Sequence, residues 1–411
     1  MSLGLGMAVL LTACSASSAA DEERKAAPDA TVAIQPADRA ADVPTDQTVV
    51  VAAHGGTLRS VTVRSADGAL PGVLSADGTR WRSTATARPG TTYTIRSVAA
   101  NSDGKQTEKS STFSTVKAAT SFDIESISPS KNTTGLTVGV GMPIMIAFDQ
   151  PIADRVAVER NLLVRTSKPV EGAWHWFDDK RVDFRPREYW PAHTDVRVEA
   201  NLAGVQGGKG MFGKRDLAID FKIGRSQITK GSVDEHVLVV RRNGKKIREM
   251  PMSASKGGVM KYHTTSGIHL AMSREPVTIM TSPGIGPGQA GYYQMTVYNT
   301  VRISNSGEYV HSAPWSVGSQ GYANVSHGCV NVSPDNAAWF IKNTLIGDPI
   351  IITGSPRPLE PTNGWGALAG ELEAVAQVEL HQGRAHPAVL LTSYGPDRGG
   401  AAVRRRRKRW S

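Results

Sequence analysis

Short runs of β-branched and apolar residues, separated by turn residues, follow one another from about residue 47 onward. The first of these strand-like runs lie at 48–51, 58–63 and 93–98. Asp-Gly pairs, which favour tight hairpin turns, occur at 67–68, 77–78 and 103–104. The pattern predicts an all-β module over residues 47–118.

A second strand-rich stretch covers residues 119–225, with apolar alternation at 143–148. Six aromatic side chains are available for its core: Trp174, Trp176, Phe177, Phe184, Tyr189 and Trp190. Both modules have the strand grammar of immunoglobulin-like β-sandwiches. Neither contains paired carboxylates, a phosphate-binding glycine loop or a metal-ligand cluster, so we interpret them as spacers or docking modules.

The third region, residues 226–354, is also mostly β in pattern. Strand-like runs at 237–240 and 246–248 flank Asn243-Gly244, a pair that favours a type I′ hairpin turn. Further runs lie at 276–280, 294–303 and 309–311. The segment 336–343 is predicted to be a helix, with Ser333 or Asp335 as its N-cap and Gly347 beyond its end. We therefore expect a mainly β chain with three folded parts and one short helix.

The N-terminus resembles a bacterial lipoprotein signal. An apolar stretch at 3–11 leads into Leu11-Thr12-Ala13-Cys14, the arrangement in which the cysteine is lipidated. We expect residues 1–13 to be a signal peptide and 14–46 a flexible spacer, since the spacer is rich in Ala, Asp, Ser, Glu and Pro. The expected location is the outer face of the cell membrane, with the protein reaching into the cell wall. The alternative is an accidental apolar N-terminus, because 1–7 contains no Lys or Arg.

Charge and composition exclude several classes of protein. The 411 residues include 47 Lys and Arg against 37 Asp and Glu, a formal net charge of +10. Six of those positive charges lie in the terminal run 404–409, so the rest of the chain is only mildly basic and no nucleic-acid partner is expected. With 40% hydrophobic and 20% charged residues, the chain fits neither a disordered protein nor one with several membrane spans.

The chain has two cysteines, and the second lies in a segment suited to nucleophilic catalysis. Cys329 is framed by Ser326, His327, Gly328 and Asn331, and fourteen residues separate His311 from Ser326. A thiol nucleophile needs a base, a group that orients the base, and N–H donors for an oxyanion. We expect His311 to be the base, His327 to shape the loop, and Gly328 to leave room for a substrate carbonyl near the main-chain amides.

Two other interpretations of this segment remain open. His311, His327 and Cys329 could be three zinc ligands, but their spacing matches known zinc motifs poorly. Cys329 could also be a buried, inert thiol. We expect neither a metal nor another cofactor.

The motif from His311 to Asn331 resembles the signature of the L,D-transpeptidases of bacterial cell-wall synthesis, with the YkuD-type catalytic domain. The segments 311–318 and 331–334 extend the similarity, and the lipoprotein signal with two immunoglobulin-like modules resembles the actinobacterial members. The resemblance implies that Cys329 is the nucleophile, that the main-chain carbonyl of Ser312 orients His311, and that His327, Gly328 and Asn331 support the loop and oxyanion. It also implies that residues 276–298 form a lid over the donor peptide. The expected substrate contacts are Met280, Tyr293, Ser306, Trp315 and Ser326.

The resemblance implies a two-step acyl transfer between peptidoglycan stems. Cys329 attacks the carbonyl of the third residue of a tetrapeptide stem and releases the terminal D-Ala, and an amine of a neighbouring stem then resolves the thioester. The product is a 3→3 cross-link, and carbapenem-type β-lactams acylate the same cysteine. Two alternatives remain open: a cysteine hydrolase (L,D-carboxypeptidase) that cuts wall peptides, and a lipid-anchored wall-binding protein without catalysis.

The tail, residues 355–411, departs from the resemblance after Gly366. The family usually ends in a short Trp-rich tail, whereas this chain continues into the basic run. With common GC-rich codons, the +1 frame after 366 regains the tryptophan spacing, so we hypothesise a frameshift there. A natural basic tail that binds anionic lipid or wall polymers is the alternative.

Overall fold

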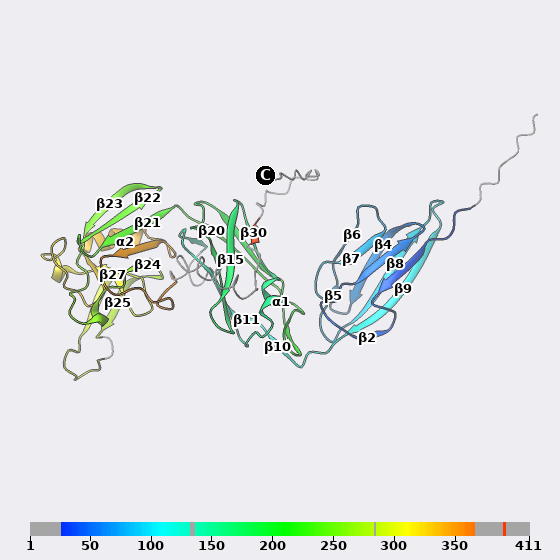
Figure 1. Cartoon of the computed structure of the whole chain (residues 1–411), viewed down its shortest axis with the longest axis horizontal. Helices are drawn as coiled ribbons and strands as arrows, with labels where there is room; N and C mark the ends of the chain where they lie inside the picture. The colour runs from blue at the N-terminus through cyan, green and yellow to red at the C-terminus, as the bar shows by residue number, and fades with distance from the viewer. Residues whose placement is uncertain (1–25, 132–135, 283–284, 366–388, 392–411) are drawn as a thin grey trace, which may run out of the picture. The chain divides into compact units, whose positions relative to one another are not determined.

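The structure is a computed structural model that describes residues 26–131, 136–282, 285–365 and 389–391 (Figure 1). These residues divide into two compact units. The first unit holds the described residues up to Val43 together with Gln47–Ala85 and Thr91–Ser114, and the second begins at Thr115 and includes two short earlier segments. Strands dominate both units, so the mainly β prediction is confirmed.

The first unit contains two antiparallel sheets. One sheet has the order β1-β3-β7-β6, with bounds Thr31–Gln35 (β1), Val50–His54 (β3), Arg80–Ser83 (β7) and Gly72–Leu74 (β6). The other has the order β2-β9-β8-β4-β5, with bounds Ala40–Val43 (β2), Gln106–Thr115 (β9), Thr92–Ala100 (β8), Thr57–Ser65 (β4) and Gly68–Ala69 (β5). Alternate side chains such as Val51, Ile95 and Phe113 are buried, the pattern of a two-sheet core.

The structure differs from the sequence expectation at the start of this unit. Residues 14–46 were expected to be a flexible spacer, but Thr31–Gln35 pairs with Val50–His54 along its whole length. Val32 and Val43 are buried. The alternation that buries them is short and surrounded by Ala, Asp and Pro, and this composition concealed two strands that pack against later parts of the chain.

The predicted turns are present. Gly68, Gly78 and Gly104 all have positive φ angles, of 135°, 69° and 81°. In this region of backbone space a Cβ atom is unfavourable, which explains the glycine at each turn.

The second unit begins with three sheets that surround one hydrophobic core. Their orders are β10-β19-β18, β11-β13-β16-β15-β30 and β12-β20-β17-β14. The strands are Thr120–Phe122 (β10), Ile124–Ser128 (β11), Thr137–Val138 (β12), Ile144–Phe148 (β13), Leu162–Thr166 (β14), Val170–Trp176 (β15), Arg181–Pro186 (β16), Asp195–Ala200 (β17), Gln206–Gly208 (β18), Met211–Gly213 (β19), Leu217–Ile223 (β20) and Val389–Leu391 (β30). Phe184 and Trp190 lie fully inside the core, with Trp174, Trp176 and Tyr189 packed at its margin.

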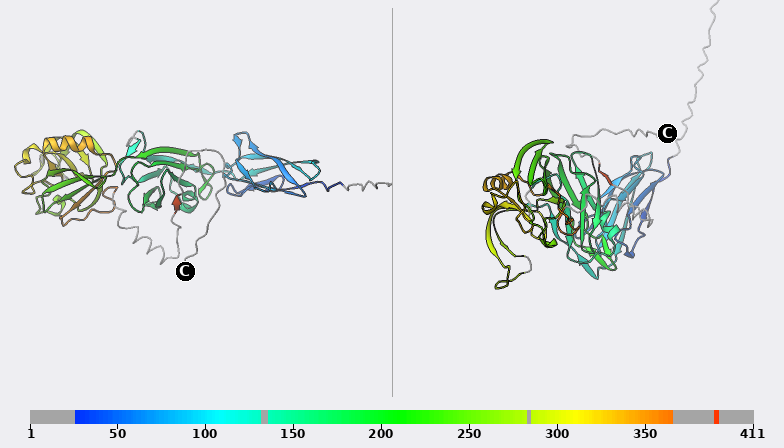
Figure 2. Two further views of the ribbon diagram at one scale, coloured as in Figure 1. Left: turned by 90° about the horizontal axis from the view of Figure 1, so that it is seen from above. Right: turned by 60° about the vertical axis from the view of Figure 1, so that its left-hand side comes forward.

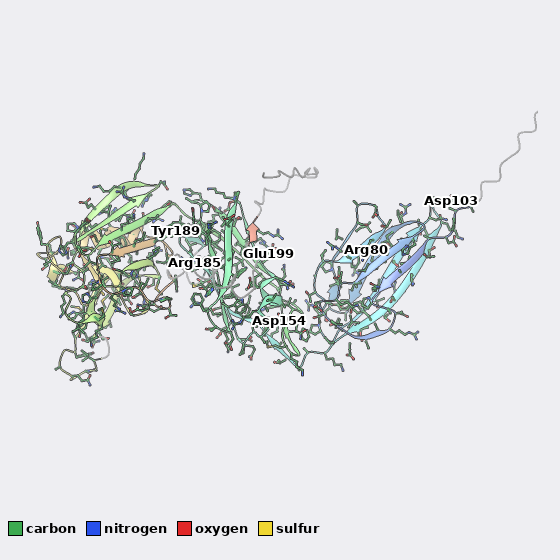
Figure 3. All side chains as sticks on the ribbon, in the orientation of Figure 1. Arg80, Asp103, Asp154, Arg185, Tyr189 and Glu199 are labelled. Carbon is green, nitrogen blue, oxygen red and sulfur yellow. The ribbon has the colours of Figure 1, made fainter. Side chains whose placement is uncertain are left out.

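A five-residue helix in this part, α1 (Arg155–Glu159), was not predicted. Asp154 lies at its start and accepts a hydrogen bond from the Ala157 amide (Figure 3). This is an N-cap interaction, which satisfies an amide that the helix itself leaves free.

The rest of the second unit is built from two further sheets. One has the order β23-β22-β21-β29-β24 and the other β25-β26-β27-β28. The strands are Gln227–Ser232 (β21), Val237–Arg242 (β22), Lys245–Pro251 (β23), Gly267–Leu270 (β24), Ser273–Thr281 (β25), Gln294–Arg302 (β26), Tyr309–Ser312 (β27), Val330–Val332 (β28) and Pro349–Thr353 (β29). Two short 3₁₀ turns occur at Met260–Tyr262 and Pro314–Ser316.

The helix α2 (Pro334–Asn343) covers the second of these sheets, where it packs on β26 and β27 (Figure 2). Ser333 is its N-cap and accepts a hydrogen bond from the Asn336 amide, so Ser333, and not Asp335, has the capping role. The predicted hairpin at Asn243-Gly244 is also confirmed, because both residues have positive φ angles, 50° and 79°, as a type I′ turn requires.

Main-chain hydrogen bonds join the sandwich strands of the second unit to the segment that follows α2. The Gly139 amide donates to the Ile346 carbonyl at 2.7 Å, and the Gly141 amide donates to the Gly347 carbonyl at 2.9 Å. A Cβ on Gly139 would lie 2.2 Å from the Asp348 nitrogen, so only glycine permits this approach. Arg225 pairs with Asp348 at 2.9 Å in the same place.

Several sequence predictions lie outside the described residues. These are the signal peptide 1–13, the lipidation site Cys14, and the tail from 366 onward except Val389–Leu391. No helix among the described residues is both long and apolar enough to span a membrane.

Candidate active site

A cleft of about 760 Å³ lies beside the β25-β26-β27-β28 sheet. Its wall includes residues from β25 and β26, from the turn 305–308, and from the loop 325–329. Ten side chains or backbones that the sequence analysis selected line this cleft: Met280, Tyr293, Ser306, His311, Trp315, Ser326, His327, Gly328, Cys329 and Asn331. Ser312 does not line the cleft, but its main-chain carbonyl contacts the His311 ring.

The loop that carries Cys329 is closed by the Ser326 hydroxyl. Ser326 Oγ donates to the Cys329 carbonyl at 2.6 Å and accepts from the Gly328 amide at 3.2 Å. Gly328 has a φ of 120°, and a Cβ there would meet its nearest neighbour only at 3.8 Å. Glycine is therefore required by the backbone angle and not by lack of space.

The strands β27 and β28 run parallel and bring His311 and Cys329 into one neighbourhood. Val310 pairs with Val330 and His311 pairs with Asn331, so Cys329 lies one residue before the partner of Val310. The His311 Nδ1 atom lies 2.9 Å from the Ser312 carbonyl oxygen. Because a carbonyl only accepts, Nδ1 carries the proton and Nε2 is left as the basic nitrogen.

Asn331 holds this histidine from the opposite strand. Its side-chain amide donates to Ser316 Oγ at 3.1 Å, and its main chain exchanges hydrogen bonds with Ser253. A further side-chain hydrogen bond reaches His311 and favours the protonated ring. Asn331 thus fixes both the position of the imidazole and its ability to accept a proton.

Burial is the largest influence on the pKa of His311. The residue is 3% exposed, and desolvation lowers its pKa to about 4, although its hydrogen bonds with the Ser312 carbonyl, which accepts from the ring, and with the Asn331 side chain act in the opposite direction. A buried positive charge is costly without a partner ion, which explains why the pKa of His311 is lowered. The ring is therefore neutral at pH 7 and able to act as a base.

The Cys329 sulfur lies between main-chain atoms of the segment 307–309. Sγ donates to the Gly307 carbonyl at 3.8 Å, and the Tyr309 backbone also hydrogen-bonds to it. Although the residue keeps part of its surface exposed, the sulfur is densely surrounded. Desolvation raises the pKa of the thiol to about 12, opposed by the Tyr309 backbone and reinforced by the Glu308 carboxylate.

His327 has a different environment from His311. Its Nε2 lies 2.8 Å from Lys256 Nζ, and its ring makes an edge contact with Tyr262 at a centroid distance of 4.9 Å. Burial, and then the Lys256 charge, lower its pKa. This histidine packs at the mouth of the cleft against Tyr262 and Tyr293, which is consistent with a role in loop shape.

The sequence analysis missed several charged residues of the cleft. Lys261, Arg302, Glu308 and Arg357 all line it. Glu308 is 5% exposed and directly precedes β27. Nothing in its sequence position distinguishes it from an ordinary surface carboxylate before a strand, because its partners Thr265 and Ser304 become neighbours only through the fold.

Two observations concern other candidate sites in the described part of the chain. A concavity of about 700 Å³ on the first unit is lined by Val50, Val73, Arg80, Arg82 and neighbours, and it contains none of the selected residues. Within the described ranges, no group of three or more His, Cys, Asp or Glu residues is arranged to hold a metal ion.

Comparison with known proteins identifies the two halves of the chain. The family described as bacterial Ig domain matches residues 40–206, and the family described as L,D-transpeptidase catalytic domain matches residues 230–352. L,D-transpeptidase 5 of Mycobacterium tuberculosis is 36% identical over 369 residues, which cover 88% of this chain and 80% of that protein. L,D-transpeptidase 2 of the same species is 38% identical and covers 77% of each chain.

Among solved structures, an L,D-transpeptidase in complex with imipenem is 40% identical, with a TM-score of 0.48. The match covers 56% of this chain and 99% of that one. By the extent and identity of the sequence matches, the chain belongs to the L,D-transpeptidase family. It is a peptidoglycan L,D-transpeptidase whose catalytic domain follows an immunoglobulin-like region.

Proposed function

We propose that the chain forms 3→3 cross-links through a thioester on Cys329. In the first step His311 Nε2 accepts the thiol proton as Sγ bonds to the carbonyl carbon of the third stem residue, and the amide bond to the terminal D-Ala breaks. The proton on His311 then passes to the departing amine of D-Ala. In this scheme His311 carries the thiol proton to the D-Ala amine, and no cofactor is needed.

In the second step the thioester gives up the acyl group and an amine receives it. An amine of a neighbouring stem attacks the thioester carbon, His311 takes the amine proton, and that proton returns to the sulfur as the C–S bond breaks. The main-chain amide of Cys329 is the proposed donor to the oxyanion in both steps, since the Gly328 amide already donates to Ser326 Oγ. The positive φ of Gly328 holds this backbone open to the carbonyl.

The observation that carries this proposal is the arrangement of Ser312, His311 and Cys329. The Ser312 carbonyl oxygen lies 2.9 Å from His311 Nδ1 and so fixes the tautomer of the ring. The strands β27 and β28 pair in parallel, and His311 and Cys329 line the same cleft. A base with its pKa near 4 is neutral across the physiological range. The arrangement supports a neutral thiol and imidazole pair that transfers its proton when the substrate arrives.

The hairpin of β25 and β26 is the proposed lid. Residues 285–293 extend away from the two sheets (Figure 1), while Met280 and Tyr293 at the base of this extension face the cleft. A lid that covers the thioester would exclude water and favour the amine, which is the difference between a transpeptidase and a hydrolase.

We extend the proposal to inhibitors and to location. Carbapenem-type β-lactams are proposed to acylate Cys329, and the relative solved with imipenem supports this for a 40% identical sequence. Attachment through a lipid on Cys14 at the outer face of the membrane is proposed from the N-terminal sequence alone.

The test is incubation of the full chain with a disaccharide-tetrapeptide, followed by mass spectrometry. Loss of D-Ala together with 3→3 dimers is the expected result, and Cys329→Ala should give neither. Loss of D-Ala without dimers would assign the protein to the hydrolases. The absence of both products with folded enzyme would leave a wall-binding protein and refute the proposal.

A further inference from the structure

A buried carboxylate lies beside the proposed nucleophile, and the mechanism above does not use it. Glu308 is 5% exposed. It occupies the middle of the segment 307–309, whose Gly307 carbonyl and Tyr309 backbone contact the Cys329 sulfur from its two sides. Whatever fixes Glu308 therefore fixes the main-chain atoms that hold the thiol.

Thr265 holds this carboxylate with two short hydrogen bonds. The Thr265 amide donates to Glu308 Oε1 at 2.6 Å and the Thr265 hydroxyl donates to Oε2 at 2.6 Å. Thr265 is itself completely buried, and its carbonyl lies 2.8 Å from Nε2 of the buried His269. His269 Nδ1 in turn contacts the Ile303 carbonyl at 3.0 Å.

The main chain of Glu308 completes the anchorage. Its amide donates to Ser304 Oγ at 3.0 Å, and its carbonyl accepts from the Ile303 amide at 2.9 Å. The chain Glu308–Thr265–His269 thus connects the end of β26 with the entry to β24, across the two sheets of the domain. A buried carboxylate that is held by neutral hydrogen-bond donors is expensive to maintain, so its position calls for an explanation.

We propose that Glu308 is a positioning residue for Cys329 that holds the 307–309 segment against the sulfur and, through its negative charge, keeps the thiol protonated until an acyl donor occupies the cleft. This inference rests on Cys329 as the nucleophile. The carboxylate lies close to the loop that carries the thiol, since a Cβ on Gly328 would be 4.0 Å from Glu308 Oε1. A carboxylate near a thiol opposes formation of the thiolate by like-charge repulsion. The proton then leaves only when His311 takes it during attack on a carbonyl.

Other charged and titratable groups also face the sulfur or the carboxylate. The cleft contributes Lys261, Tyr293, Arg302, Tyr309, His311, His327 and Arg357, and His269 lies behind Thr265. Arg302 is occupied by the carbonyls of Ser304 and Asn305, and Arg357 by Glu360. Glu308 is the carboxylate that lines the cleft, and among the described groups it is the acidic side chain that raises the thiol pKa.

Glu308→Gln isolates the charge. A glutamine can still accept from the Thr265 amide, and its NH₂ can donate to the Thr265 hydroxyl, so the geometry is retained while the charge is lost. The matched control is Glu275→Gln, which removes a carboxylate held by Ser273 and Thr278 in the same domain but outside the cleft lining.

The experiment measures alkylation of Cys329 in the full chain by iodoacetamide as a function of pH, with melting curves to establish folding. Cys14 is replaced by Ser in every sample, so that one thiol is observed. For Glu308→Gln we expect a lower apparent thiol pKa and an alkylation rate at pH 8 that rises by up to about tenfold, since one pKa unit changes the thiolate fraction tenfold. Glu275→Gln should match the parent.

An unchanged pH profile in folded Glu308→Gln would overturn the proposal. If this variant does not fold, the parent still provides a test, because a parent thiol that titrates near pH 8.5 or below would also refute it. Alkylation needs no peptidoglycan, so the proposal and the transpeptidase function can fail separately: a shifted profile without D-Ala release would refute only the latter.

Discussion

At the proposed site, the positions of two protons differ from those in many thiol enzymes. Burial drives the pKa values of Cys329 and His311 in opposite directions, to about 12 and about 4, so neither group is charged near pH 7. Enzymes with a preformed thiolate and imidazolium pair have the reverse order. The thiol and the imidazole therefore carry no charge before substrate binds, and in the proposed mechanism proton transfer accompanies bond formation.

This order of pKa values predicts the pH dependence of acylation. The reactive form, a protonated thiol with a neutral imidazole, is the main form at all pH values between about 4 and about 12. We expect the rate of acylation by a carbapenem to be nearly constant from pH 6 to 9 and to fall as the pH drops toward 4, where His311 gains its proton. Stopped-flow measurements would show this, and a bell-shaped profile centred near pH 7 would contradict it.

Gly328 should tolerate no side chain for a reason of backbone geometry. We expect Gly328→Ala to cost about 1–3 kcal/mol of local strain at a φ of 120°. The loop can relieve that strain only by moving Cys329, so carbapenem acylation should slow at least tenfold while the protein stays folded. Mass spectrometry of the adduct with time, together with a melting curve, checks both parts. Parent-like acylation would show that the backbone angle is not required.

At the scale of elements, α2 supports the sheet that carries the site. Ser333 caps the helix and directly follows β28, the strand that pairs Asn331 with His311. We expect Ser333→Ala to lower the free energy of unfolding by about 1 kcal/mol through loss of the cap. Acylation per folded molecule should be unchanged. A melting temperature equal to that of the parent would contradict the capping role.

Strands and turns with local signals were predictable, and elements that depend on distant partners were not. Asn243-Gly244 identified its hairpin because the turn type is encoded in two residues. By contrast, β1 is a strand only because Val50–His54 pairs with it, and the five-residue α1 is too short for a periodic signal.

The same contrast holds within the site. His311, Gly328 and Cys329 lie in a segment whose residue types already indicate nucleophilic chemistry. Glu308 and Thr265 are separated by 43 positions and become partners only when β24 and β27 enter adjacent sheets. A sequence pattern can indicate which groups react, but not which buried groups set their proton affinities.

At the scale of the second unit, Asp348 connects the sandwich to the catalytic domain. It pairs with Arg225 at 2.9 Å and accepts from the Leu345 amide at 2.8 Å. Burial raises its pKa to about 6, against the opposing effect of Arg225. Above that pH the carboxylate is charged and the pair is formed. Between about pH 4 and pH 6 the folded state holds a proton that the unfolded chain has already released, so the free energy of unfolding rises as the pH falls through this range.

We expect Asp348→Asn to lower the free energy of unfolding by about 2–4 kcal/mol at pH 7, because Arg225 is left without its counter-ion in a largely buried position. The loss should grow as the pH falls from 6 toward 4, because the folded parent is stabilised by taking up a proton on Asp348 and the Asn side chain takes up none. Urea unfolding at pH 7 and pH 5 measures the difference. A loss that is the same at pH 7 and pH 5 would contradict the raised pKa of Asp348.

The enclosure of the Cys329 sulfur also affects how readily the thiol is oxidised. Hydrogen peroxide oxidises thiolates far faster than thiols, and a sulfur that keeps its proton offers it little to attack. An acylating drug or a stem peptide presents a carbonyl carbon to the sulfur, and in the proposed mechanism His311 takes the thiol proton as the C–S bond forms. The environment that keeps the proposed nucleophile protonated thus also protects it from sulfenic acid formation between turnovers.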